Sequence, residues 1–446
     1  MAMTRDMTAG SEARHLIGFT LPLLAGNLLQ QTYNVADTMI VGKYLGDDSL
    51  AAVGATGSIT YLFYTLCIGL SLGAGILISQ LFGARLRNKV RTAIVGSAAV
   101  TAIFGAVISI LSVFLARPVL TALSVPDNLL SRSVTYMRIA CAGTLCVAAY
   151  NWINAVMRAL GDSKTPLIFL GVSTALNVGL DLLFVVCFKM GVGGAAFATV
   201  LSQGVSAVSC IIFCFKKNKD IRPRKDELRP QPAVMKKVIR IGLPIAAQNG
   251  LVSISMVALQ RVTNGFGKTV MASYTVSMRI EQFIQQPFSS LSAAISTFAG
   301  QNIGASQEKR AQNGLKVSVR IGIVFAFAVL AVYLVCADLI VGCFVSKKAV
   351  ISIGTKALIM TGCFYAPLSL IHTVRGFLNG AGDVSFALIN GLTEVVCRVG
   401  LSLILTNISG ISYWGIWITT SATWVATAAV CVIRYRKGKW KLKALT

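Results

Sequence analysis

The sequence is poor in charged residues, and acidic residues are the scarcest. Only 13% of its 446 residues are charged, and Asp and Glu together number 16. A soluble domain carries about 25% charged residues. This shortage excludes an ordinary soluble enzyme, a disordered chain and a fibrous repeat.

Signals for metal, disulfide and enzyme chemistry are also missing. The chain has two histidines, and none of its eleven cysteines forms a CxxC pair. Nearly all the cysteines lie in apolar runs, which favours small core hydrophobes over disulfides or metal ligands. The segment 265–269 ends like a phosphate-binding loop, but Val262 stands where that motif needs its first glycine. We therefore expect no enzyme, no cofactor and no use of ATP.

Long apolar runs dominate what is present. Hydrophobic residues make up 55% of the chain, and runs of about 18 or more residues, long enough to cross a hydrocarbon core, recur throughout. They predict an all-α membrane protein with twelve transmembrane helices. The predicted spans are residues 16–40, 50–80, 92–116, 133–157, 166–188, 193–215, 238–262, 270–300, 314–341, 350–376, 385–406 and 412–434.

The net charge of +25 comes from basic residues in the short connections between spans. No basic stripe is interleaved with aromatic residues, so we expect no nucleic-acid partner. With twelve spans, 29 Lys and Arg residues fall on one side of the membrane and nine on the other. Because cytoplasmic loops carry the excess, we predict a multi-pass protein of the cell membrane with both termini in the cytoplasm. The first fifteen residues lack the apolar core of a removable signal peptide.

The sequence repeats itself at an offset of 221 residues. Five matches hold this offset, and Leu21-Pro22 recurs one residue out of step as Leu243-Pro244. The repeat predicts two six-helix lobes. Because six is even, both lobes enter the membrane from the same side, and we expect a pseudo-two-fold axis along the membrane normal to relate them. This is the parallel-repeat arrangement of transporters. The matches are Gln80 with Gln301, Gly83 with Gly304, Asp162 with Asp383, Leu180 with Leu401 and Gly194 with Gly415.

One long polar stretch, residues 216–240, separates the two halves and contains three prolines. Such a stretch is typical of a linker. We predict an N-terminal lobe at 1–215, a cytoplasmic linker at 216–237, a C-terminal lobe at 238–434 and a basic cytoplasmic tail at 435–446.

Polar side chains within the first span fall on one helical face. Asn27, Gln30, Asn34 and Asp37 are spaced three, four and three residues apart, so they form one stripe. Tyr33, four residues before Asp37, borders it. Polar residues within a membrane are costly and indicate a functional site.

The fifth and sixth spans add oxygen-bearing side chains. Asn177 and Asp181 are four residues apart and share a helix face, and Thr199 follows in the next span. A buried Asp can take a proton near physiological pH, and two such acids beside amide and hydroxyl oxygens can equally hold Na⁺. The alternative is that the amides join helices while the acids face water.

The repeat favours the functional interpretation. Arg398 stands at the position matching Asn177, and Ser402 at the position matching Asp181. Residues 258–260, which match the region of Asp37, contain no acid. Scaffold acids would be needed in both halves, so their loss predicts a cation site in the N-terminal lobe alone.

The C-terminal half carries its own charged residues within spans. Glu394 and Arg398 are four residues apart, which favours a pair on one helix. Arg279 and Glu281 are two apart and cannot pair with each other, so both are candidates for contact with a substrate or proton in the lobe cavity. His372 titrates in a useful range, although a lone histidine is more often a packing residue.

The chain resembles the multidrug and toxic compound extrusion (MATE) family over essentially its whole length. The resemblance is carried by Val35-Ala-Asp37-Thr38 with Val41-Gly42, by the segment from Arg158 to Pro166, and by its echo from Asn379 to Asp383. The bacterial branch similar to DNA-damage-inducible and archaeal-type members fits best.

This resemblance implies a proton or sodium site at Asp37, Asn177 and Asp181, with Gln30 and Thr199 as neighbours. It also implies that the first span bends at Pro22. The sodium-coupled branch known for norfloxacin export places acids in spans seven and ten. This chain has Val252 and Leu368 there, so no cation site of that type is expected in its C-terminal lobe.

The function expected on these grounds is export of small organic, cationic compounds in exchange for H⁺ or Na⁺ by alternating access. The partners expected are these substrates and the lipid bilayer, with a monomer favoured. The alternative is a flippase or exporter of a lipid-linked or other anionic compound on the same fold.

Overall fold

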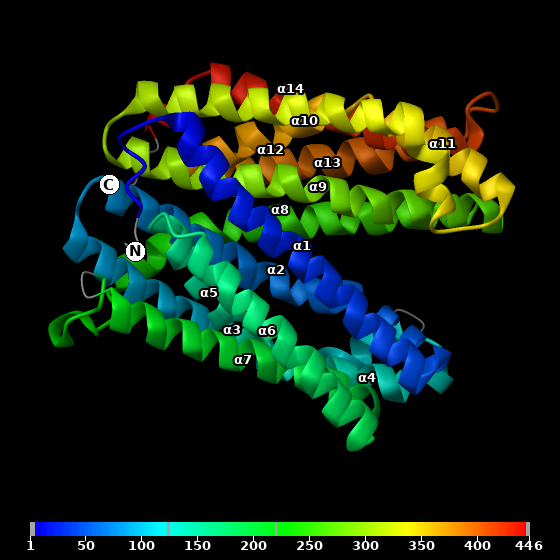
Figure 1. The fold of residues 1–446 in the computed structure, drawn as a ribbon, viewed down its shortest axis with the longest axis horizontal. Coiled ribbons are helices and arrows are strands. Elements are labelled where there is room, and N and C mark those ends of the chain that lie inside the picture. The colour runs from blue at the N-terminus through cyan, green and yellow to red at the C-terminus, as the bar shows by residue number, and fades with distance from the viewer. Residues whose placement is uncertain (1–4, 123–124, 219–220, 443–446) are drawn as a thin grey trace. The chain divides into compact units, whose positions relative to one another are not determined.

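The computed structural model describes residues 5–122, 125–218 and 221–442, which contain fourteen α-helices and four short helical segments (Figure 1). Parts of the predicted lobes, linker and tail that fall on residues 1–4, 123–124, 219–220 and 443–446 lie outside these described residues. The described part of the chain contains no β-strand, in agreement with the predicted all-α class.

The first half of the chain forms seven α-helices. Among them α2 packs against α3, α4 and α5, while α6 packs against α7. The helices are α1 (Glu12–Leu45), α2 (Asp47–Gly83), α3 (Arg87–Ala122), α4 (Asp127–Ala142), α5 (Thr144–Ala159), α6 (Lys164–Asp181) and α7 (Gly191–Lys217), with the π-helix η1 (Leu182–Cys187) after α6 and the 3₁₀ turn η2 (Lys225–Glu227) after α7.

The second half forms another seven. Here α12 packs against α9, α10 and α14, and α13 packs against α14. The helices are α8 (Pro232–Asn264), α9 (Gly267–Gly304), α10 (Glu308–Gly342), α11 (Lys348–Gly362), α12 (Tyr365–Gly380), α13 (Ser385–Leu405) and α14 (Gly415–Arg436), with the 3₁₀ turns η3 (Ser412–Trp414) and η4 (Lys439–Leu442).

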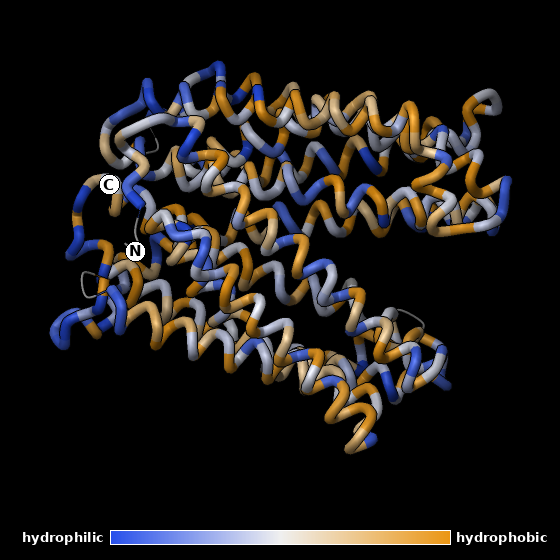
Figure 2. The backbone as a smooth tube through the Cα atoms, in the orientation of Figure 1, coloured by the Kyte–Doolittle hydropathy of each residue, from blue (hydrophilic) through white to orange (hydrophobic). Residues whose placement is uncertain are grey.

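All twelve predicted spans coincide with one long helix or with one pair of consecutive helices. By length and composition, eight helices of the described residues qualify as membrane spans, and ten qualify when each bent pair counts as one. The remaining long helices, α1 and α9, carry more polar residues along their length. Figure 2 shows hydrophilic residues gathered in the loops and at the helix ends, as expected for spans that face lipid.

Two spans predicted as continuous helices are broken. The first bends by 44° between α4 and α5, and its counterpart bends by 50° between α11 and α12. The first break falls at Gly143, where a side chain would collide with Val200 of α7. The second falls at Phe364, which lies 221 residues further along the chain. A hydropathy pattern reports apolar length, and close packing against a neighbouring helix decides where the backbone breaks.

The backbone confirms the repeat at the predicted offset. Residues with positive φ occur in pairs 221 positions apart, one member in each half. Such conformations are uncommon outside glycine, so their recurrence at matched positions shows the same turns made twice. The pairs are Gly46 and Gly267 (φ 79° and 83°), Arg85 and Ser306 (59° and 60°), Gly161 and Gly382 (84° and 88°), and Gly191 and Ser412 (61° and 49°).

The chain divides into two compact units, and each half contributes its first helical turns to the other unit. Leu21–Ala246 forms most of the first unit, while Met7–Thr20 belongs to the second. The division falls next to Pro22 in α1 and Pro244 in α8, and both helices continue through their proline. In the second unit the Met7 amide donates to Gln301 Oε1 at 2.9 Å, and Glu12 pairs with Arg310 at 3.4 Å.

Candidate functional site

Two acids from different helices meet in the first unit. Asp37 lies on α1, and Asp181 is the last residue of α6. Their carboxyl groups lie within hydrogen-bonding range of each other, and Asp181 is fully buried. Two carboxylates at this range repel each other unless a proton or a cation lies between them.

Thr199 of α7 links this pair to neighbouring polar groups. The Tyr33 hydroxyl donates to Thr199 Oγ1 at 3.1 Å, and Asn177 Nδ2 donates to the same oxygen at 3.4 Å. Tyr33 also lies within electrostatic range of Asp37 and Asp181. The structure thus brings together five of the predicted residues, from α1, α6 and α7.

The oxygens of this cluster lack donors. Asp37 Oδ1, Asn177 Oδ1 and both carboxylate oxygens of Asp181 are buried and accept no hydrogen bond from the described residues. Buried polar atoms are almost always paired, and each exception needs an explanation. Four such oxygens from three side chains form an arrangement that a proton or a small hard cation would satisfy. Within the part of the chain that the structure describes, no group of three or more His, Cys, Asp and Glu side chains gathers as a metal site.

A π-helix begins directly after Asp181. The α-helical pattern of α6 ends there, and η1 continues the same span with wider turns. π-Helical turns are rare and often occur at functional sites. The counterpart α13 stays α-helical through Ser402, which stands at the position of Asp181. The irregular turn therefore accompanies the half that carries the acids.

Other predicted residues of α1 lie outside this cluster. Gln30 and Asn34 have exposed side chains, and the structure joins neither of them to Asp37 or Asp181. The helix contacts the rest of its unit through side chains, such as Val41 against Val185 and Ala195. Pro22 lies inside α1, well before the acid.

Tyr136 of α4 lies near the two acids, and the sequence did not reveal this. It lies within electrostatic range of both Asp37 and Asp181. Its own helix carries no other polar group of the cluster, so no spacing rule points to it. The repeat could have marked it, because Ala357 stands at the matching position in the second half.

The predicted residues of the second half are distributed over several helices. Glu281 of α9 is buried, whereas Arg279 is exposed. His372 is buried and stacks on Phe288, with ring centroids 6.2 Å apart. The stacking gives His372 a packing role.

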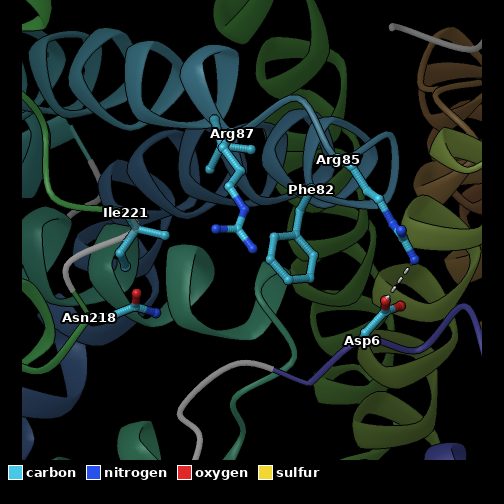
Figure 3. Close-up of a pocket in the computed structure, with 7 residues that line it drawn as sticks. Asp6, Phe82, Arg85, Arg87, Asn218 and Ile221 are labelled. Atoms are coloured by element: carbon cyan, nitrogen blue, oxygen red, sulfur yellow. Dashed lines mark ion pairs between the residues drawn. The ribbon is translucent and has the colours of Figure 1, made fainter.

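A separate cavity of about 300 Å³ lies at the connection between α2 and α3. Figure 3 shows Arg85 pointing to Asp6, with which it forms an ion pair at 3.9 Å. None of the predicted site residues lines this cavity. Its basic residues, Arg85 and Arg87, belong to the connections whose Lys and Arg residues predict the orientation of the protein in the membrane. The lining residues are Asp6, Phe82, Arg85, Arg87, Val90, Asn218 and Ile221.

Comparison with known families gives a match in each half of the chain. The sequence model of the MatE family matches residues 22–183 and residues 244–404. These ranges contain Asp37, Asn177 and Asp181 in the first half, and Glu281 and Arg398 in the second. The two matches agree with the internal repeat.

Similar proteins align along almost the entire chain. The sequence is 27% identical to the "probable multidrug resistance protein YpnP" of Bacillus subtilis, covering 99% of this chain and 98% of that protein. Two solved structures, described as MATE in the bent and in the straight conformation, share the fold with a TM-score of 0.91 at 23% identity. They cover 99% and 98% of this chain, and 98% of their own chains.

Proposed function

The chain belongs to the MatE family of membrane transporters, and from this premise we propose that it exports organic cations in exchange for H⁺ or Na⁺. The observation that carries the proposal is the group of four buried oxygens without donors at Asp37, Asn177 and Asp181. The multidrug resistance protein among its relatives supports a substrate class of small organic compounds.

In the proposed mechanism, the coupling ion binds between Asp37 and Asp181. A proton or Na⁺ there removes the repulsion between two carboxylates and draws α1 toward α6. Asn177 and Thr199 supply further oxygens, and the Tyr33 hydroxyl holds Thr199 in place. Loss of the ion restores the repulsion between the two carboxylates, and this repulsion favours movement of α1 away from α6.

Ion binding drives transport only if the ion's affinity differs between the inward-open and outward-open states. We propose that α1 is the element that changes, with Pro22 as the point at which it bends, because a proline removes a helical hydrogen bond. The outward-open state would then release the organic cation as it takes up H⁺ or Na⁺.

The test is transport in proteoliposomes with ethidium as the organic cation. A pH gradient and a sodium gradient are imposed separately on wild type, Asp37→Asn and Asp181→Asn. We expect one gradient to drive ethidium movement in wild type and neither to drive it in the two variants. Asp48→Asn is the matched control, because Asp48 is an exposed acid of the same unit, and it should transport like wild type.

Two results would overturn the proposal. Gradient-driven export that survives in either variant would show that the two acids do not carry the coupling ion. A wild-type protein that moves no organic cation under either gradient would favour the flippase alternative, to be pursued with anionic lipid-linked substrates.

A further inference from the structure

The cavity at the connection between α2 and α3 has a counterpart in the second unit. A cavity of about 650 Å³ lies at the connection between α9 and α10. Three of its lining positions stand 221 residues beyond positions that line the first cavity. The segment after α7 lines the first cavity, and the segment after α14 lines the second. The repeated fold therefore forms this cavity twice. The matched positions are Phe82 and Ile303, Arg85 and Ser306, and Arg87 and Glu308.

The second cavity has a basic lining. Lys309, Arg310 and Lys441 contribute three positive charges, and Glu308 contributes one negative charge. Arg310 pairs with Glu12 at 3.4 Å, and Lys441 lies 3.6 Å from Glu308. Lys309 is exposed and forms no ion pair with a described residue. An excess of positive charge therefore remains at this cavity, and it suits an anionic ligand.

Trp440 holds one wall of the cavity in place. It is 2% exposed, its ring stacks on Tyr435 with centroids 6.0 Å apart, and it meets the edge of Phe377 at 5.0 Å. Its Nε1 donates to the Tyr435 carbonyl oxygen at 3.2 Å. The Lys441 Nζ lies 5.8 Å from the centroid of the Trp440 ring. These contacts fasten η4 to α12 and α14 and keep Lys441 at the cavity.

The cavity lies close to predicted span ends. Ile303 follows the predicted span 270–300 by three residues, and Trp440 follows the span 412–434 by six. At the rise of an α-helix these offsets are about 5–9 Å, and the headgroup layer is about 5–8 Å thick on each side of a bilayer. Tryptophan is enriched at this depth, and the basic connections predict that this is the cytoplasmic side.

We propose that this cavity binds the headgroup of an anionic phospholipid from the cytoplasmic leaflet. That leaflet is rich in anionic lipids, and basic pockets at the cytoplasmic ends of membrane helices bind their headgroups. The ammonium groups of Lys309 and Lys441 donate to the phosphate oxygens. Arg310 stays with Glu12 and with the Met7 carbonyl oxygen, to which its Nε and Nη2 donate at 3.3 and 3.2 Å. A lipid bound here joins η4 to the α9–α10 connection, whatever compound the protein transports.

The test is native mass spectrometry of the full-length protein in detergent, titrated with dioleoylphosphatidylglycerol. The double variant Lys309→Gln, Lys441→Gln replaces the excess positive charge with an excess of negative charge from Glu308 and Glu12. We expect its affinity for this lipid to fall about tenfold or more. The matched control is Lys437→Gln, Lys439→Gln. It removes two exposed lysines of the same tail that do not line the cavity, and it should bind the lipid like wild type.

A second variant locates the lipid without changing any charge. Gln307 lines the cavity and is exposed, so Gln307→Trp places a large side chain there and should also weaken binding. Two further ligands identify the source of the phosphate. Dioleoylphosphatidylcholine has the same acyl chains with a zwitterionic headgroup, and it should bind more weakly. Inorganic phosphate has no acyl chains, and it should not displace the lipid.

Four results would overturn the proposal. The first is unchanged phosphatidylglycerol affinity in Lys309→Gln, Lys441→Gln or in Gln307→Trp. The second is an equal loss of affinity in the control variant, which would mean that the lipid responds to the net charge of the tail. The third is phosphatidylcholine binding as tight as that of phosphatidylglycerol. The fourth is displacement of the lipid by inorganic phosphate, which would assign the cavity to a soluble anion.

Discussion

The acidic side chains of the two units differ in what surrounds them. Asp162 accepts hydrogen bonds from the amides of Lys164 and Thr165 at the start of α6. Its repeat counterpart Asp383 is held by two bonds from Arg434, both 2.7 Å long. These saturated acids occur in both halves, as scaffold residues should. Asp181 is also buried, but it has no donor among the described residues and no acidic counterpart, as the proposed ion site requires.

Glu227 offers a residue-scale prediction on pH. Arg91 Nε donates to both of its carboxylate oxygens, at 2.9 and 2.7 Å, and this contact lowers the pKa of Glu227 below its usual value. A lowered pKa in the folded state means that the pair stabilises the protein above the unfolded pKa, about 4.3. This stabilisation is lost as the pH falls through the folded pKa.

Glu227→Gln should therefore lower the Tm by a few degrees at neutral pH in detergent. The difference from wild type should begin to shrink as the pH falls below about 4.3, where Glu227 of the unfolded chain takes up protons, and should vanish once the pH lies below the lowered pKa of the folded state. Thermal unfolding measured across this range checks it. A Tm difference that stays constant with pH would assign the effect to packing instead of charge.

Spacing along single helices was sufficient to place Tyr33 beside Asp37 and Asn177 beside Asp181, because residues four apart share a face. The absence of these acids from the second half supports their proposed role in ion binding. Spacing did not identify Tyr136, because a spacing rule relates only residues on one helix. The approach of α4 to α1 and α6 depends on tertiary packing. Gln30 and Asn34 share the stripe of α1 but lie outside the cluster, because only part of that stripe meets α6 and α7.

Helix packing in the first unit depends on glycines that bring backbones together. A Cβ added at Gly73 of α2 would lie 2.6 Å from the Gly242 nitrogen of α8. One added at Gly69 would lie 2.5 Å from the Ala246 Cα. Small residues four apart allow such close approach of membrane helices. The obstacle in each case is backbone, which cannot rotate away.

Because of this close contact between α2 and α8, we expect Gly73→Val to cost about 1–3 kcal/mol of folding free energy, as overpacking usually does. Gly54→Val is the matched control on the same helix, because a Cβ at Gly54 meets no atom within 4 Å. Thermal unfolding of both variants in detergent makes the comparison. Equal destabilisation by the two substitutions would show that helix propensity, and not the contact with α8, governs the result.

The elements themselves were largely predictable, and their irregularities were not. Apolar length located all twelve spans, including the polar helices α1 and α9. The breaks after α4 and α11 and the π-helix after Asp181 are invisible to such a pattern. They are set by local packing and hydrogen bonding within spans whose average composition is unchanged.

The distribution of basic residues is a property of the whole molecule. It predicts that both termini and the linker lie in the cytoplasm, since Lys and Arg are retained on that side. A green fluorescent protein fused after residue 446 should fluoresce. Alkaline phosphatase fused after Gly265, in the predicted outer connection, should be active in intact cells. The reverse pattern of reporters would invert the proposed direction of export.

The exchanged helix starts bear on how the chain assembles. Met7–Thr20 belongs to the second unit, and Pro232–Ala246 belongs to the first. This reciprocal exchange of N-terminal segments resembles that of a domain-swapped dimer, here within one polypeptide. We therefore expect that neither half folds by itself: a fragment ending in the linker lacks the helix start that its own unit contains in the whole chain, and the complementary fragment would have to supply it.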